Sequence, residues 1–144
     1  MAMQLTRAGE YAVKSLIYLA AQQHDARVMA SEVATEENIP INFVRKILES
    51  LAKTGLVKSY RGAGGGFTLG RTPEDISIRQ VVEAVEGPLA LNQCLTPNAC
   101  VNLPDCPMSQ VWIEAQRAVE GVLERYSLAD VARTRALRRQ ILND

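Results

Sequence analysis

All three cysteines of the chain lie in one short polar segment, as Cys94, Cys100 and Cys106, with five residues between each neighbouring pair. Pro, Asn and Asp residues fill the spaces, and this turn-rich composition disfavours three small side chains buried in a core. Clustered thiols of this kind suit metal or redox chemistry. Three explanations stay open: a zinc site, although zinc knuckles usually have shorter gaps; a thiol–disulfide switch, which needs only two thiols; and an iron–sulfur cluster, whose usual ligands are thiolates.

An iron–sulfur cluster usually takes four protein ligands, so three cysteines leave one position open. The single histidine, His24, falls at the end of the first predicted helix and suits a solvated helix end better than a ligand. Asp105, Ser109 and Glu10 are candidate oxygen donors. Glu10 lies among apolar residues early in that helix, where the helix dipole alone would also favour a carboxylate.

Composition and charge limit the classes of protein to which this chain can belong. The chain has 144 residues, 47% of them hydrophobic, and no net charge. No apolar run approaches the roughly 20 residues that span a membrane, and the N-terminus lacks the apolar core of a signal peptide. We therefore expect a cytoplasmic protein with no membrane partner. Residues 1–72 carry nine Lys/Arg and six Asp/Glu, whereas residues 73–144 carry seven and ten, which permits a basic contact face on the first half.

The first half of the chain predicts a helix-turn-helix followed by a β-hairpin. A first helix over residues 7–23 can be capped by Thr6. Two further helices, 30–37 and 41–54, are separated at Pro40. The runs "LVKSY" and "GFTLG" then flank a glycine-rich turn, which gives the winged-helix arrangement found in DNA-binding proteins. The glycines match neither the Walker nor the dinucleotide pattern, which argues against a nucleotide site.

The second half predicts helices on either side of the cysteine segment. A helix over residues 78–86 ends at Gly87-Pro88, and a long apolar stripe runs through residues 107–126. This stripe either folds back on its own core or pairs with a second chain, and we favour a dimer because palindromic operators call for a two-fold partner. The expected fold is mainly α with a small β-hairpin, in three parts: a winged helix-turn-helix domain over 1–72, a connecting helix and cysteine segment over 73–106, and a dimerisation helix with a basic C-terminal helix over 107–144.

This order of elements resembles the Rrf-two family of bacterial transcriptional regulators, from "LTRAGEYAV" to "SLADV". The most specific pieces are "GLVKSYRGAGGGFTLGR" and the regular cysteine spacing. The resemblance implies a homodimeric regulator, commonly a repressor, whose binding to palindromic operator DNA is controlled by a [2Fe–2S] or [4Fe–4S] cluster that senses nitric oxide, redox state or iron and cluster supply. A cluster-free regulator switched by thiol oxidation or by a partner is the alternative, and an electron carrier is a more distant one. No catalytic constellation suggests an enzyme.

The resemblance also implies particular site residues. The implied DNA-binding residues are Asn42, Phe43, Arg45, Lys46 and Arg61. We add Lys58 and Gly64 of the predicted wing as further candidate contacts. The two-donor fork of Arg45 suits guanine edges, whereas Lys46, Lys58 and Arg61 suit phosphates.

The three cysteines fall on the cluster ligands of the family. Some members add a histidine three residues after the last cysteine, where this chain has Ser109. Others use an acidic residue early in the first helix of the partner subunit, which falls on Glu10. The resemblance therefore implies Glu10 of the partner subunit as the fourth ligand.

Overall fold

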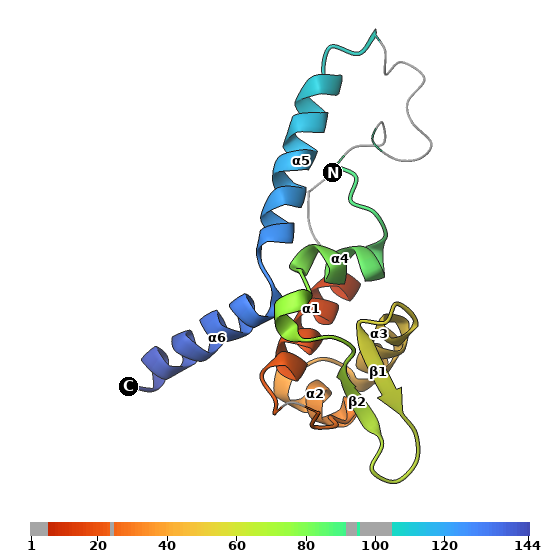
Figure 1. The fold of residues 1–144 in the computed structure, drawn as a ribbon, viewed down its shortest axis with the longest axis vertical. Helices are drawn as coiled ribbons and strands as arrows, with labels where there is room; N and C mark the ends of the chain where they lie inside the picture. Colours follow the sequence, from red (N-terminus) through yellow and green to blue (C-terminus); the bar gives the residue numbers. More distant parts are fainter. Residues whose placement is uncertain (1–5, 24, 92–94, 96–104) are drawn as a thin grey trace.

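The computed structural model describes residues 6–23, 25–91, 95 and 105–144. These residues form six α-helices, a short 3-10 helix and a two-stranded antiparallel sheet (Figure 1), which confirms the predicted fold class. The elements are α1 (Arg7–Ala20), α2 (Ala30–Glu37), α3 (Ile41–Lys53), β1 (Val57–Tyr60), β2 (Gly66–Leu69), η1 (Pro73–Asp75), α4 (Ile78–Glu86), α5 (Ser109–Arg125) and α6 (Leu128–Asn143). None of these helices is long and apolar enough to cross a bilayer.

Helix α1 lies at the centre of the folded body and contacts α2, α3, α4, α6 and β2. Thr6 caps it as predicted, because its side chain accepts the N–H of Gly9 at 3.2 Å. Leu16 is fully buried, together with Leu48 of α3, Val81 of α4 and Leu128 of α6. One hydrophobic core therefore joins the N-terminal helices to elements well beyond residue 72.

Helices α2 and α3 form the predicted helix-turn-helix. Asn38 terminates α2 in a left-handed conformation with φ 55° and ψ 52°, and Pro40 precedes the first turn of α3. The buried face of α3 carries Val44, Ile47, Leu48 and Leu51. This spacing of three and four residues turns the remaining side chains of α3 towards solvent.

The predicted hairpin is present, and a third segment of backbone forms hydrogen bonds with one of its strands. Val57 of β1 pairs with Leu69 of β2, and Tyr60 pairs with Gly66, in an antiparallel register. On the other edge of β2, Val28 and Phe67 exchange two backbone hydrogen bonds of 2.9 and 2.8 Å. The residues between α1 and α2 thus line one edge of the wing.

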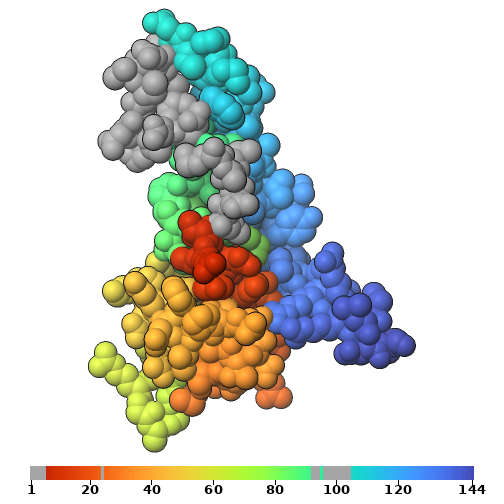
Figure 2. All heavy atoms as spheres, turned by 180° about the vertical axis from the view of Figure 1, so that it is seen from behind, coloured from red at the N-terminus to blue at the C-terminus, as the bar shows by residue number. Residues whose placement is uncertain are grey.

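A short backbone joint fixes the corner between α5 and α6. The N–H of Ile78 donates to Tyr126 O, and the N–H of Leu128 donates to Ile76 O, both at 2.9 Å. Helix α5 rises from the body on one side of this joint, and α6 projects on the other (Figures 1 and 2). The first turns of α6 contact α1, whereas residues 136–144 are exposed. The basic C-terminal helix is therefore anchored in the core at its start and solvated only at its end.

Leu128→Ala tests this anchoring. Leu128 is 0% exposed, so we expect the free energy of unfolding to fall by about 2–5 kcal/mol, from lost burial and the cavity left behind. The matched control is Leu142→Ala in the same helix, where the side chain is 84% exposed and the expected change is within about 0.5 kcal/mol. Urea denaturation of both variants gives the comparison. Equal losses would contradict a role of Leu128 in the common core.

Candidate nucleic-acid interface and cysteine segment

The exposed face of α3 carries four of the residues predicted to bind DNA. Asn42, Phe43, Arg45 and Lys46 are all exposed, because the buried positions of α3 lie on the opposite face. Phe43 is partly supported from below, since its ring lies edge-on to Tyr11 of α1 with 5.9 Å between the ring centroids. The structure therefore gathers these side chains on one solvent-facing surface of the second helix of the helix-turn-helix.

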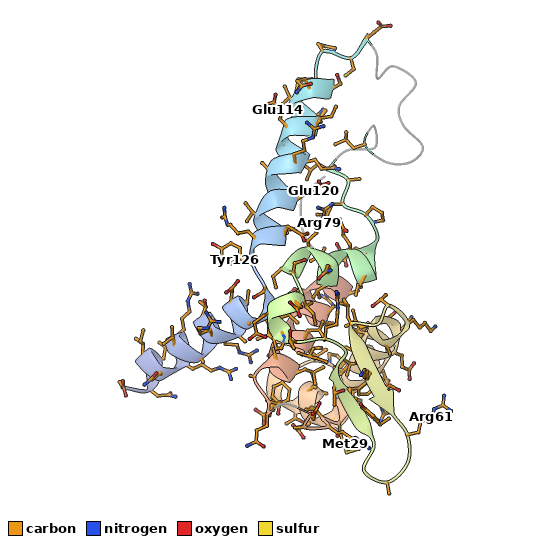
Figure 3. All side chains as sticks on the ribbon, viewed as in Figure 1. Met29, Arg61, Arg79, Glu114, Glu120 and Tyr126 are labelled. Atoms are coloured by element: carbon orange, nitrogen blue, oxygen red, sulfur yellow. The ribbon has the colours of Figure 1, made fainter. Side chains whose placement is uncertain are left out.

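The wing carries the other three predicted contacts. Arg61 lies at the exposed tip and points away from the body (Figure 3). Gly64 lies in the same tip at φ +75°, a conformation that side chains with a Cβ rarely adopt. Lys58 lies nearer the base, where it lines an open cavity of about 530 Å³ between the hairpin and the end of α1. Arg61 and Gly64 thus share the tip, and Lys58 lies apart from them.

A further arginine contacts the wing and has no motif in the sequence to reveal it. The guanidinium of Arg27 lies 3.9 Å from the ring centroid of Tyr60, and its Nη1 donates to Gly64 O at 2.8 Å. Arg27 stands in the connection between α1 and α2, where hydrophobic periodicity says nothing about side-chain partners.

Of the predicted cluster ligands, the described residues include Cys106 and Glu10. Cys106 is a free, half-buried thiol, and its carbonyl accepts the N–H of Ser109 at the start of α5. Cys94 and Cys100, like His24, lie outside the described residues. Within the described part of the chain, no group of three His, Cys, Asp or Glu side chains is placed to hold a metal ion.

Glu10 lies in the first turn of α1 with its side chain 54% exposed. Its carboxylate pairs with Lys14 one turn later, with 3.2 Å between Oε1 and Nζ. An exposed pair at this helical spacing contributes only about 0.3–0.5 kcal/mol, so the carboxylate is easily redirected to another partner.

The N-terminus of α1 is held by the last residue of α4. Glu86 accepts the backbone N–H of Thr6 at 2.7 Å and also contacts the Thr6 hydroxyl. A carboxylate at this position is favoured because it faces unpaired N–H groups at the positive end of the helix dipole. Glu86 immediately precedes the segment that leads to the cysteines, and Glu10 lies one turn along α1, so one contact joins the two regions.

An ionic network joins α4 and α5, the helices that flank the cysteine segment. Arg79 of α4 lies 3.0 Å from Glu83, 3.6 Å from Glu120 and 3.8 Å from Glu124, the last two in α5. Figure 3 shows Arg79 and Glu120 close together between the two helices. The hydrogen bond to Glu83, followed by the charges of all three carboxylates, raises the pKa of Arg79 above its ordinary value. Gln116 extends the network, since it accepts the N–H of Leu91 and donates to Glu120.

The two faces of α5 differ in an unusual way. The face towards α4 carries the polar side chains of Gln116, Glu120 and Glu124. The half-buried Trp112 and Leu123 share this face by helical spacing. On another side of the helix, apolar side chains are exposed: Val111, Val119 and Val122, with Tyr126 directly after the helix, are between 38% and 50% accessible. Apolar side chains usually face the core, so these exposed residues form an apolar stripe that the described part of the chain does not bury as it buries the apolar faces of α1 and α3.

Together, the helix-turn-helix, the glycine-rich wing and the basic exposed side chains define a winged-helix DNA-binding regulator. The model of the Rrf2 family, described as an iron-dependent transcriptional regulator, matches residues 5–134, so the chain belongs to this family. Proteins of this family are transcriptional regulators rather than enzymes. The predicted family and the predicted function as a DNA-binding regulator are both confirmed.

Named relatives place the chain within the family. It is 38% identical over 131 residues to the HTH-type transcriptional regulator NsrR of Halalkalibacterium halodurans, covering 90% of each chain. Among solved structures it resembles CymR, the global cysteine regulator of B. subtilis, with a TM-score of 0.78 and 27% identity over 92% of this chain and 98% of that one. It also resembles IscR of T. potens, with a TM-score of 0.74 and 27% identity over 93% of this chain and 89% of that one.

Arg79→Gln tests the link between α4 and α5. The substitution leaves three neighbouring carboxylates without this guanidinium, so we expect the urea midpoint of unfolding to fall at low ionic strength. Salt screens partly exposed charges, and the loss should shrink in about 0.5 M NaCl. Urea denaturation at both salt concentrations measures the effect, with Arg117→Gln on the exposed surface of α5 as the control. A loss that ignores salt would contradict an electrostatic role.

Proposed function

We propose that this regulator binds operator DNA as a homodimer, and that an iron–sulfur cluster on Cys94, Cys100 and Cys106 and on Glu10 of the partner subunit controls that binding. The observation that carries the proposal is the pairing of a described winged helix with a regular three-cysteine segment in one chain. The description of the family as iron-dependent supports the same conclusion. The three-part division at residues 72 and 106 and the role as a repressor belong to the proposal as well.

The exposed stripe of α5 supports a dimer. A second copy of α5 would cover Val111, Val119, Val122 and Tyr126, whereas the polar face of α5 is already occupied by α4. Two chains related by a two-fold axis would also present two copies of α3 to a palindromic operator.

The ligand atoms of the described residues suit a cluster in which one protein ligand is not a cysteine. The Cys106 thiol is free and partly accessible, and the carboxylate of Glu10 is held only by a weak surface ion pair. When bound, such a cluster would supply a centre that responds to redox state or to small ligands such as nitric oxide. A carboxylate is a hard ligand for iron beside thiolates, so the corner held by Glu10 would be the easiest one to exchange.

Helix α1 offers a route from the cluster ligands to the DNA. Tyr11 follows Glu10 directly, and its ring contacts Phe43 on the exposed face of α3. Glu86 holds the start of the same helix from the other side. Because packed helices shift as rigid elements, a change of partner at Glu10 would reach the DNA-binding face through α1.

Mixed dimers test whether Glu10 acts across the dimer. One chain carries Glu10→Ala and the other carries Cys94→Ser, Cys100→Ser and Cys106→Ser, so that one complete site forms only if the ligands come from different chains. We expect heterodimers isolated anaerobically with two affinity tags to lose iron to a chelator as slowly as the wild type, at half its iron content. Iron and sulfide analysis with absorption spectroscopy provides the readout.

The reciprocal pairing is the control. A wild-type chain combined with a chain that carries all four substitutions lacks the complete site in this arrangement, and its cluster should be lost as fast as in Glu10→Ala homodimers. Slow loss here would place both ligand types in one chain. Lys14→Ala, which removes the ion pair but no ligand, should behave like the wild type. A wild-type protein that stays colourless after reconstitution would instead favour a thiol switch.

Two arginine substitutions test the DNA contacts. Arg61→Ala should weaken cognate and scrambled DNA alike and reduce the salt slope by about one, because a phosphate contact carries no sequence information. Arg45→Ala should cost about 1–3 kcal/mol on the cognate operator and much less on scrambled DNA, as loss of a base contact does. Fluorescence anisotropy at several salt concentrations measures both, with Arg117→Ala of α5 as the control. Selective loss with Arg61→Ala would instead assign base reading to the wing.

A further inference from the structure

The tip of the wing lacks a core beneath it. Residues 61–64 are exposed, and each strand of the hairpin is only four residues long. A two-stranded hairpin of this length is marginal by itself. Lys58 of β1 gives the tip little support, because its side chain is exposed and lines the open cavity beside the end of α1. The orientation of Arg61 therefore depends on contacts from outside the hairpin.

Arg27 supplies such a contact at two points. Its guanidinium covers the ring of Tyr60, the last residue of β1, at 3.9 Å from the centroid. Its Nη1 donates to the carbonyl of Gly64 on the other side of the tip at 2.8 Å. One planar side chain thus connects the two arms of the turn that carries Arg61.

The backbone of Arg27 is itself fixed, so the side chain has a firm base. Its neighbour Val28 is buried and exchanges two hydrogen bonds with Phe67 of β2. Gly66 allows this approach, because it lies at φ +134° and a Cβ there would come within 2.8 Å of Val28 O. The contacts of Arg27 therefore tie the tip to the same edge of the hairpin that Val28 holds.

We infer that Arg27 is a positioning residue for DNA recognition, which holds the wing tip so that Arg61 meets the DNA. This inference rests on the proposed contact between Arg61 and the operator, and it assigns Arg27 a role through the wing. The rival role is a direct phosphate contact by Arg27 itself. A positioning role needs the planar, stacking guanidinium, whereas a phosphate contact needs mainly a positive charge.

The contacts of Arg27 with Tyr60 and Gly64 form a clamp across the wing tip, and hydrogen exchange of the free protein tests this clamp without DNA. Arg27→Ala, Arg27→Lys and Tyr60→Leu should each speed amide exchange in the peptide spanning residues 61–66 by about tenfold, because the tip opens more often. Arg71→Ala is the matched control, since it removes an arginine that lines the cavity at the wing base, and exchange at the tip should not change. Exchange in α3 should stay at the wild-type rate, which shows that the variants are folded. Unchanged exchange at the tip in all three variants would overturn the clamp.

A double-mutant cycle then tests whether Arg27 acts through Arg61. We expect Arg27→Ala to weaken operator binding by about tenfold in the wild-type background and by less than about twofold in the Arg61→Ala background. Arg27→Lys should fail to restore binding. Additive losses, or full rescue by lysine, would overturn the positioning role and assign a direct phosphate contact. If Arg61→Ala leaves operator binding unchanged, the proposed contact between Arg61 and DNA is wrong, and the positioning role of Arg27 is wrong with it. Hydrogen exchange still tests separately whether Arg27 holds the wing tip.

Discussion

The burial of α1 on several sides is the constraint on which the rest of this structure depends. Leu16 is fully buried at the centre of the core, and α1 contacts α3, α4 and α6. Close packing leaves such a helix little freedom to move alone. The contact of Glu86 with the start of α1 and the contact of Tyr11 with Phe43 therefore lie on one rigid helix. The position of Glu10 on this helix links the proposed cluster site to the DNA-binding face.

A network of polar contacts joins α5 to the neighbouring part of its own chain. Arg79 lies among carboxylates of α4 and α5, and Gln116 reaches back to Leu91. Polar and ionic contacts of this partly exposed kind orient a helix more than they stabilise it. Burial of the exposed apolar side chains of α5 would therefore be favourable, and the proposed dimer buries them against a second chain.

The residues proposed to contact DNA are exposed side chains and turn positions of the winged unit. The α3 side chains proposed to contact DNA project from a helix whose other face is buried, so their positions follow from the core. The wing tip has no comparable support, and its position follows from Val28 and Arg27. The two regions proposed to contact DNA are therefore positioned by different interactions. Hydrophobic packing positions α3, and a few polar contacts position the wing tip.

The sequence by itself determined the elements whose signals are local. The spacing of Val44, Ile47, Leu48 and Leu51 predicts α3 and its exposed face, since helical periodicity follows from backbone geometry alone. The Thr6 cap and the glycine-rich turn are equally local features. The cysteine spacing narrowed the chemistry to three classes and, with the winged helix, pointed to the family. Cys94 and Cys100 lie outside the described residues, so the ligand set that includes Glu10 remains a prediction.

Only the tertiary structure decided the polar contacts between distant parts of the chain. Arg27 and Gly64 are 37 residues apart, and Thr6 and Glu86 are 80 apart. No periodicity encodes such pairs, because a hydrogen bond between side chain and backbone depends on where the fold brings the two groups. The apolar stripe of α5 was visible in the sequence, but its direction was not. Arg79 and Gln116 form polar contacts that hold one face of α5 towards its own chain, so Val111 and Val122 on another face are exposed to solvent.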